Sequence, residues 1–145
     1  MARFKIEGLD AINDAIRQAG EIPWEVESEA IKAMAAVART KVKATGESMG
    51  VRGDDESGVH ILDHITTTKP KQTDSGGYSD VTFSGTRTRG NTRTRNAEIA
   101  FINEFGKKGQ KARPFIRQAS EQHADEVAKP GEKIVGDWFE KTLAP

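Results

Sequence analysis

The clearest hydrophobic pattern in the chain lies between residues 23 and 46. Its apolar positions recur at helical spacing and are Val26, Ala30, Met34, Ala38 (or Val37) and Val42. This spacing places them on one face of an α-helix. Pro23 suits the start of a helix, because a proline lacks only an N–H that has no helical partner there. With Gly46 as its expected end, the pattern predicts one long amphipathic helix.

Two shorter patterns precede this helix. Phe4 and Ile6 alternate with polar residues, which is typical of a short strand. Apolar residues then recur at helical spacing, at Leu9, Ile12, Ile16 and Ala19. Gly20 is a suitable C-terminal cap. The first 20 residues are therefore expected to form a strand and a helix of about three turns.

The centre of the chain predicts a β-hairpin. Residues 65–71 are rich in β-branched side chains, and residues 78–83 alternate between apolar and polar. The sequence Asp74-Ser75-Gly76-Gly77 between them favours a turn. Residues 58–64 fit either one helical turn or the start of a strand.

A low-complexity segment follows at residues 85–95, where threonine and arginine alternate around a central glycine and asparagine. It contains no acidic residue and no apolar side chain that could anchor it by burial. We expect a long mobile loop, flexible over residues 85–96, between two strands. Its arginines are expected to be exposed, either as contacts to phosphates or to an acidic protein surface or as the solvated tip of a flexible hairpin. They are Arg87, Arg89, Arg93 and Arg95.

The last third of the chain begins with an apolar stretch at residues 97–105, which fits a buried strand or a short helical turn. Phe105 and Phe115 are expected to be core residues on either side of a surface turn. Gly106 supplies a backbone conformation that residues with a Cβ resist, and Pro114 is expected to open the last helix. Pro130-Gly131 is expected to break or kink that helix before a final amphipathic segment.

The order of these elements predicts an α+β fold in one domain over residues 1–145. We expect a small antiparallel sheet, with its hairpin and mobile loop, packed against two N-terminal helices and a C-terminal helix. The chain is 30% charged and 35% hydrophobic, and it has no cysteine, which excludes disulfides and thiolate metal sites. No apolar run approaches the length of a membrane span, so no membrane partner is expected.

The distribution of charge along the chain is more informative about partners than the overall composition is. The chain has no net charge, yet residues 85–117 contain nine basic and two acidic residues, a net charge of +7. Residues 1–84 carry −4 and residues 118–145 carry −3. A basic centre between acidic flanks indicates either self-assembly through opposite charges or an anionic partner.

A metal-dependent hydrolase is a weaker alternative. His60 and His64 are four residues apart, with Asp63 between them, and a third ligand would have to be His123 or a distant carboxylate. The glutamate that follows the first histidine in zinc proteases is missing, so two surface histidines are the favoured interpretation. Neither a nucleophile elbow nor a phosphate-binding loop is present. We therefore expect a non-enzymatic protein without a cofactor.

The segments Glu104-Phe105-Gly106 and Ala112-Arg113-Pro114-Phe115-Ile116-Arg117 carry a resemblance. The run from Glu104 to Ala119 resembles the tail-completion, or head–tail joining, minor tail protein family of long-tailed bacteriophages. Residues 4–12 and 58–65 are also similar to family segments, so the resemblance covers most of the chain. It implies a structural virion protein at the neck, present in the host cytoplasm during assembly.

The resemblance also implies partners. They are identical copies in a ring of six, a head-closure or connector protein, a tail terminator or tail tube protein, and the genomic DNA that passes through the lumen. Arg113 and Arg117 are four residues apart and are expected to share a helix face that meets a neighbouring carboxylate. Glu25 and Glu29 are the expected acidic partners, with residues 54–56 as the alternative. The second functional hypothesis is a basic, sequence-independent nucleic-acid-binding module.

Overall fold

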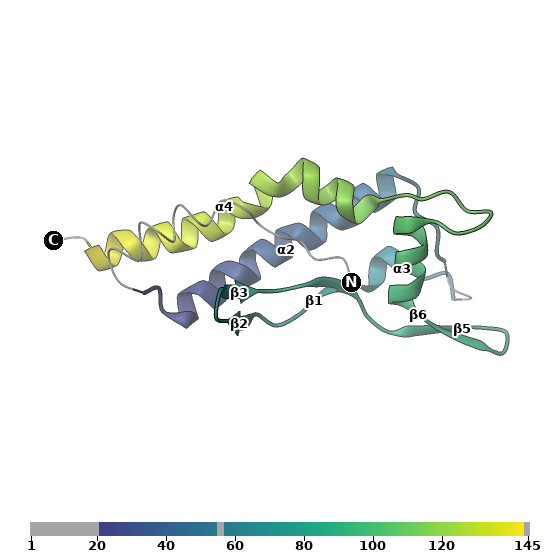
Figure 1. The fold of residues 1–145 in the computed structure, drawn as a ribbon, viewed down its shortest axis with the longest axis horizontal. Coiled ribbons are helices and arrows are strands. Elements are labelled where there is room, and N and C mark those ends of the chain that lie inside the picture. The colour runs from purple at the N-terminus through teal and green to yellow at the C-terminus, as the bar shows by residue number, and fades with distance from the viewer. Residues whose placement is uncertain (1–20, 55–56, 144–145) are drawn as a thin grey trace.

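The structure is a computed structural model, and it describes residues 21–54 and 57–143. The strand and helix predicted within residues 1–20 lie outside the described residues, as do Asp55 and Glu56. Two long helices dominate the described part (Figure 1): α2, Trp24–Ser48, and α4, Phe115–Leu143. They run side by side in opposite directions. Neither they nor any other described helix is long and apolar enough to cross a membrane.

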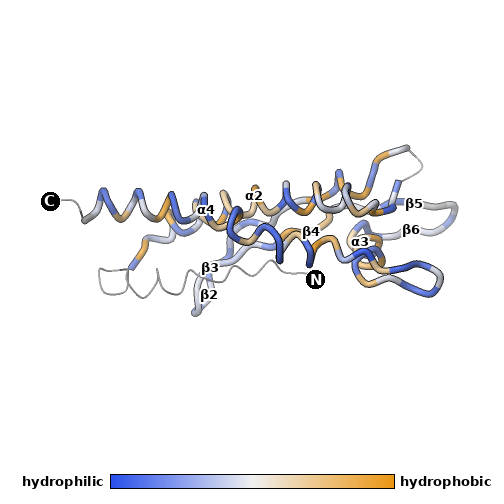
Figure 2. Tube along the Cα trace, turned by 90° about the horizontal axis from the view of Figure 1, so that it is seen from above, coloured by the Kyte–Doolittle hydropathy of each residue, from blue (hydrophilic) through white to orange (hydrophobic). Residues whose placement is uncertain are grey.

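The apolar stripe predicted for α2 is the main part of the core. Ala30, Met34, Ala38 and Val42 are buried, and only Val26 at the start remains half-buried. Helix α4 contributes its own buried residues to this seam, namely Phe115, Ala119, Val127 and Val135. Figure 2 shows apolar and polar positions alternating along both helices. This is the pattern expected of helices that bury one face each.

The helix end predicted at Gly46 is wrong, because α2 continues two residues beyond it. Of the two outcomes expected at Pro130, a break or a kink, the break does not occur, because α4 continues through the proline. A Cβ on Gly46 would lie 2.6 Å from Leu62 Cδ2, and one on Gly131 would lie 2.5 Å from Met34 Sδ. Both glycines therefore allow close packing rather than ending a helix. Burial of Val127 and Val135 on either side of Pro130 offsets the backbone hydrogen bond that the proline removes.

The predicted central hairpin is confirmed, in two paired sections. The 3₁₀-helix η1, Ile61–His64, leads into β1, Ile65–Thr67, and β2, Lys71–Thr73; the chain returns through β3, Gly76–Tyr78, and β4, Val81–Phe83. Strand β1 pairs antiparallel with β4, and β2 pairs antiparallel with β3. The hairpin lies along α2, where the Glu27 carboxylate accepts a 2.7 Å hydrogen bond from the Gly77 N–H.

The segment expected to be a long mobile loop is a second hairpin. Strand β5, Thr86–Arg89, pairs antiparallel with β6, Thr92–Arg95, and α3, Asn96–Phe105, follows directly. The apolar stretch at 97–105 is thus helical. With small two-stranded antiparallel sheets beside the helices, the fold is α+β, as the sequence predicts.

Candidate functional site

The β5–β6 hairpin extends away from the helix pair at the end of the molecule where α3 lies (Figure 1). Its register places Thr86 opposite Arg95 and Thr88 opposite Arg93. Residues directly opposite each other in a sheet share a face, and successive residues alternate between faces. Arg93 and Arg95 therefore lie on one face of the hairpin, and Arg87 lies on the other.

Arg87 is not exposed, which corrects the expectation for the whole segment. Only 6% of its surface is accessible. Its Nε donates a 2.8 Å hydrogen bond to Asn96 Oδ1, and its Nη1 donates a 2.6 Å bond to the Gly53 carbonyl. Nη2 is buried without a hydrogen-bond partner. The missing apolar anchor is thus replaced by a buried guanidinium that ties the base of the hairpin to the 51–54 segment and to α3.

The other face of the hairpin is exposed to solvent. Arg93 Nε donates to Thr86 Oγ1 at 3.0 Å, and the Arg95 guanidinium forms an ion pair with Glu98 at 3.0 Å. Both arginines are exposed, as expected. Arg89 belongs to β5, but its side chain lies outside the described part of the structure. The face carries two guanidinium groups, which can contact phosphates or carboxylates of a large partner.

The run from Glu104 to Phe115 forms a compact connection between α3 and α4. Glu104 is 5% exposed, and its two carboxylate oxygens accept backbone hydrogen bonds from Ile116 and Arg117, at 2.9 and 3.0 Å. These N–H groups belong to the first turn of α4, which has no helical acceptors for them. A carboxylate at this position also interacts favourably with the helix dipole. Glu104 is therefore the N-terminal cap of α4, supplied by another helix.

Gly106 has the role predicted for it. It ends α3 with a φ of 77°, and a Cβ there would lie 2.8 Å from the Ala112 nitrogen and 2.9 Å from the Gln110 carbonyl oxygen. Only glycine combines that conformation with that proximity. Pro114 directly precedes α4, as expected. The chain returning to α4 is also fixed by a 2.6 Å hydrogen bond from the Arg113 N–H to the Asn103 carbonyl.

The two phenylalanines of this run differ in burial. Phe115 is fully buried, as predicted, and its ring meets that of Phe83 edge-on, with centroids 6.0 Å apart. Phe105 is 64% exposed, so its assignment to the core is wrong. Its ring instead contacts that of Phe101, which is 57% exposed, with centroids 4.6 Å apart and the ring planes tilted by 43°. The buried face of α3 is occupied by other residues: Asn96, Ala100, Asn103 and Glu104.

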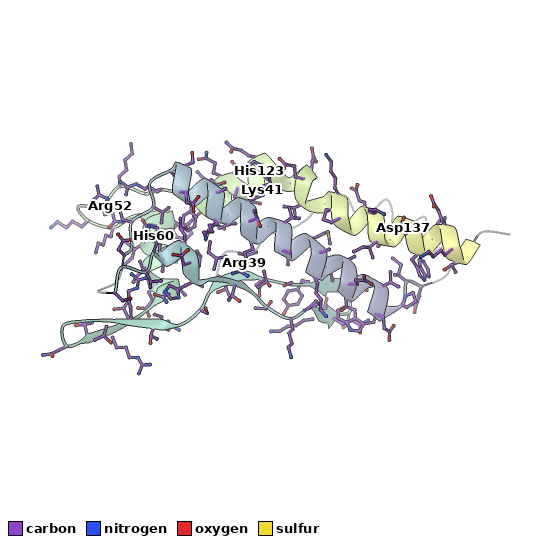
Figure 3. The ribbon with its side chains drawn as sticks, turned by 180° about the vertical axis from the view of Figure 1, so that it is seen from behind. Arg39, Lys41, Arg52, His60, His123 and Asp137 are labelled. Atoms are coloured by element: carbon purple, nitrogen blue, oxygen red, sulfur yellow. The ribbon has the colours of Figure 1, made fainter. Side chains whose placement is uncertain are left out.

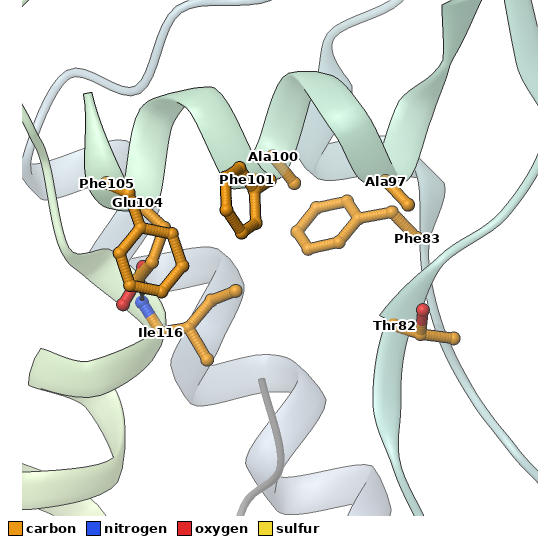
Figure 4. Close-up of a pocket in the computed structure, with 8 residues that line it drawn as sticks. All are labelled: Thr82, Phe83, Ala97, Ala100, Phe101, Glu104, Phe105 and Ile116. Atoms are coloured by element: carbon orange, nitrogen blue, oxygen red, sulfur yellow. Dashed lines mark hydrogen bonds between the residues drawn. The ribbon is translucent and has the colours of Figure 1, made fainter. Parts of the chain in front are cut away.

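A shallow apolar groove runs along this aromatic pair. Figure 4 shows both rings projecting from α3 near Ile116, a residue of the first turn of α4. The remaining lining residues are Thr82, Phe83, Ala97, Ala100 and Glu104. The hydrophobic pattern of the chain does not predict this feature. Phe101 and Phe105 are four residues apart and so share a helical face, but spacing alone cannot tell which face is covered.

The predicted interface residues do not form one cluster. Arg113 lies before the first residue of α4 and so does not share a helix face with Arg117, which corrects that expectation. Arg113 is half-buried, whereas Arg117 is exposed and lies 3.9 Å from Glu121. Glu25 and Glu29 are exposed in the first turns of α2, at the opposite end of that helix from α3 (Figure 1).

The histidines serve local contacts. His60 accepts a hydrogen bond from the Leu62 N–H through Nδ1 and contacts the Val51 carbonyl through Nε2 at 2.9 Å, so it caps η1. Asp63 pairs with Lys43, which lowers the pKa of that carboxyl group. Nε2 of His64 is buried without a partner. Within the described residues, no three His, Asp or Glu side chains lie close enough together to hold a metal ion.

His123 belongs to a different cluster, on the exposed side of the two long helices. Figure 3 shows it close to Lys41, and both contact Glu126. The hydrogen bond from Lys41, and then that from His123, lower the pKa of Glu126 from 4.5 to about 2. This cluster links α2 to α4 and lies apart from the hairpin.

Comparisons of the chain with family models, with curated proteins and with solved structures found no match.

Proposed function

We propose that this protein is a structural subunit of the neck of long-tailed bacteriophages. In this role a ring of identical copies joins the tail to the head and leaves an axial passage for DNA. Its neighbours are a head-closure or connector protein on one side and a tail terminator or tail tube protein on the other. The protein acts through assembly contacts, not through chemistry on a substrate.

The observation that carries this proposal is the structure of the run on which the family resemblance rests. Glu104 caps α4, Gly106 ends α3, and Phe115 anchors α4 in the core. All three of these residues stabilise the connection between α3 and α4. The resemblance therefore involves residues on which the fold depends.

The surfaces next to this connection also suit an assembly role. An exposed aromatic pair and a basic hairpin lie at one end of α2, and exposed glutamates lie at the other. Contacts of this kind are individually weak, and exposed ion pairs contribute only about 0–1 kcal/mol each. Repetition around a ring makes them effective, because each subunit is held by two neighbours at once.

The test is a phage stock that lacks this protein, examined by electron microscopy. We expect filled heads and separate tails that do not join. Supplying the wild-type protein should restore complete virions. Supplying a variant with Arg93→Ala and Arg95→Ala tests whether the exposed face of the hairpin takes part, with Lys133→Ala and Lys141→Ala on α4 as a control for lost positive charge. Complete virions in the absence of the protein would refute the neck role.

One observation favours the second candidate, a sequence-independent nucleic-acid-binding module. Arg93 and Arg95 share one exposed face of a hairpin that extends from the body. A DNA-binding titration at several salt concentrations separates the two candidates. For a nucleic-acid-binding module, the logarithm of the association constant falls with the logarithm of the salt concentration, with a slope of about −0.9 per phosphate contacted. This binding should be lost with the same two substitutions. A neck subunit is expected to bind free DNA only weakly.

A further inference from the structure

The most unusual surface of the described residues is the aromatic pair on α3. Phe101 and Phe105 are 57% and 64% exposed, and the only other exposed large apolar side chain among residues 21–54 and 57–143 is Val59, at 37%. Two aromatic rings in contact beside an apolar groove form a patch of the kind that marks interaction sites. Aromatic side chains at such positions supply large contact areas at a small cost in conformational entropy.

The surroundings of this groove are basic. Exposed Lys107 and Lys108 follow Phe105 after the single residue Gly106, and exposed Arg117 follows the groove residue Ile116. The one acidic group in the lining is Glu104, and both of its oxygens already accept hydrogen bonds from the backbone of α4. The groove is therefore suited to a partner that combines apolar side chains with carboxylates.

A surface with this complementary character lies at the other end of α2. Residues 21–31 contain four glutamates and no basic residue, and Glu21, Glu25 and Glu29 are exposed. Ile22 and Val26 are half-buried among them and so offer partly accessible apolar atoms. Within the described part of the chain, neither Glu25 nor Glu29 has a basic partner.

We propose that the groove beside Phe101 and Phe105 binds the N-terminal turns of α2 of a second copy of this chain. Helix α3, which carries the groove residues Phe101 and Phe105, lies at the opposite end of α2 from the acidic turns (Figure 1), so the contact is heterologous: each copy offers a different surface to each neighbour. Such contacts generate rings when the rotation between copies closes. This inference rests on the proposed function, since it names the contact between subunits of the ring.

The first test measures self-association of the purified full chain by sedimentation velocity at low salt. We expect Phe101→Ser with Phe105→Ser to weaken association at least tenfold. Val59→Ser is the matched control, since it also removes an exposed apolar side chain, and it should leave association unchanged. Circular dichroism of each variant reports whether the fold is retained; both targeted rings are exposed, so we expect it to be.

The second test exchanges the charges. Lys107→Glu with Lys108→Glu should weaken association, and Glu25→Lys with Glu29→Lys should do the same. Mixing the two variants tests the pairing directly, because the glutamates at positions 107 and 108 of one variant can then meet the lysines at positions 25 and 29 of the other. We expect association to recover in the mixture. Asp74→Lys with Glu132→Lys is the control for altered net charge, and it should have no effect.

A wild-type chain that stays monomeric at millimolar concentration and low salt would overturn this inference. It would mean that a different protein, or another segment of the same chain, covers the groove. Recovery that fails in the mixed charge variants would also overturn it. Neither outcome decides the neck role, which depends on whether virions form without the protein. Conversely, self-association through this groove in a protein that virions do not need would refute only the neck role.

Discussion

Two regions of this molecule, the long helix pair and the region around α3, are stabilised by different kinds of buried group. Along α2 and α4 the interior is apolar, with Ala30, Met34 and Val42 of one helix against Val127 and Val135 of the other. Around α3 and the β5–β6 hairpin the most deeply buried groups include polar and charged side chains, namely Arg87, Asn96, Asn103 and Glu104. Four of the six buried polar residues in the described chain lie in this one region.

These polar groups bind the backbone. Asn103 exchanges hydrogen bonds with both the N–H and the carbonyl of Arg52, and Asn96 donates to the Ser84 carbonyl. Each therefore fixes a chain segment that has no regular partner of its own. An apolar core tolerates small shifts between helices, whereas a network of directional bonds specifies one arrangement. This difference predicts that core substitutions in the helix pair lower the stability of the whole fold. Substitutions in the α3 region should mainly loosen the segments that they contact.

The largest expected effect comes from Phe115→Ala. This side chain is fully buried, so its removal should lower the free energy of unfolding by about 3–5 kcal/mol. Phe105→Ala should change it by less than about 0.5 kcal/mol, because an exposed ring gives up little burial. Urea denaturation of both variants measures the difference. Equal losses for the two would contradict the burial described for Phe105.

Glu104→Ala should come next, at about 1–3 kcal/mol, since it leaves two backbone N–H groups of α4 without an acceptor. Glu104→Gln keeps one acceptor oxygen and should lose less. Glu98→Ala, on the same helix but exposed, is the matched control, and its loss should stay below about 1 kcal/mol. The same denaturation experiment ranks the three, and a Glu104→Ala variant no less stable than the control would rule out the capping role.

Arg87→Met should act mainly on the hairpin. It removes the hydrogen bonds to Asn96 and Gly53, so the amides of residues 86–95 should exchange with solvent faster. The amides of α2 should keep their protection. Arg93→Met removes an exposed arginine from the opposite face of the same hairpin and serves as the control. Unchanged exchange in the Arg87 variant would mean that the hairpin does not depend on its buried guanidinium.

The smallest effect concerns pH and the helix pair. The pKa of Glu126 falls from 4.5 to about 2 on folding, through its contacts with Lys41 and His123. A carboxyl group with a lowered pKa stabilises the fold above its unfolded pKa, and this contribution is lost as pH falls from 4.5 towards 2. Because the cluster is exposed, the effect should be slight. The melting temperature of the Glu126→Gln variant should be below that of the wild type at neutral pH, and the difference should disappear at acidic pH.

The comparison also explains which predictions failed. Helix α2 follows from its four-residue period, and the central hairpin follows from β-branched strands around a glycine-rich turn. In α3 the usual burial of apolar side chains and exposure of polar ones is inverted, because Asn103 and Glu104 face inward while Phe101 and Phe105 face outward. Periodicity identifies the two faces of such a helix, but hydrophobicity then selects the wrong one as buried.

The sequence by itself determined the apolar seam of α2, the turn at Asp74-Ser75 with the glycines that follow it, the requirement for glycine at position 106 and the basic character of residues 85–117. These depend on local backbone preferences, on periodicity and on charge, which neighbouring residues carry. Only the tertiary structure decided that Arg87 is buried, that Pro130 lies within a continuous helix and that Phe105 is exposed. In each case the deciding contact comes from residues distant in sequence: Gly53 for Arg87, α2 for the helix around Pro130, and the backbone of α4, which draws Glu104 inward and leaves Phe105 outside.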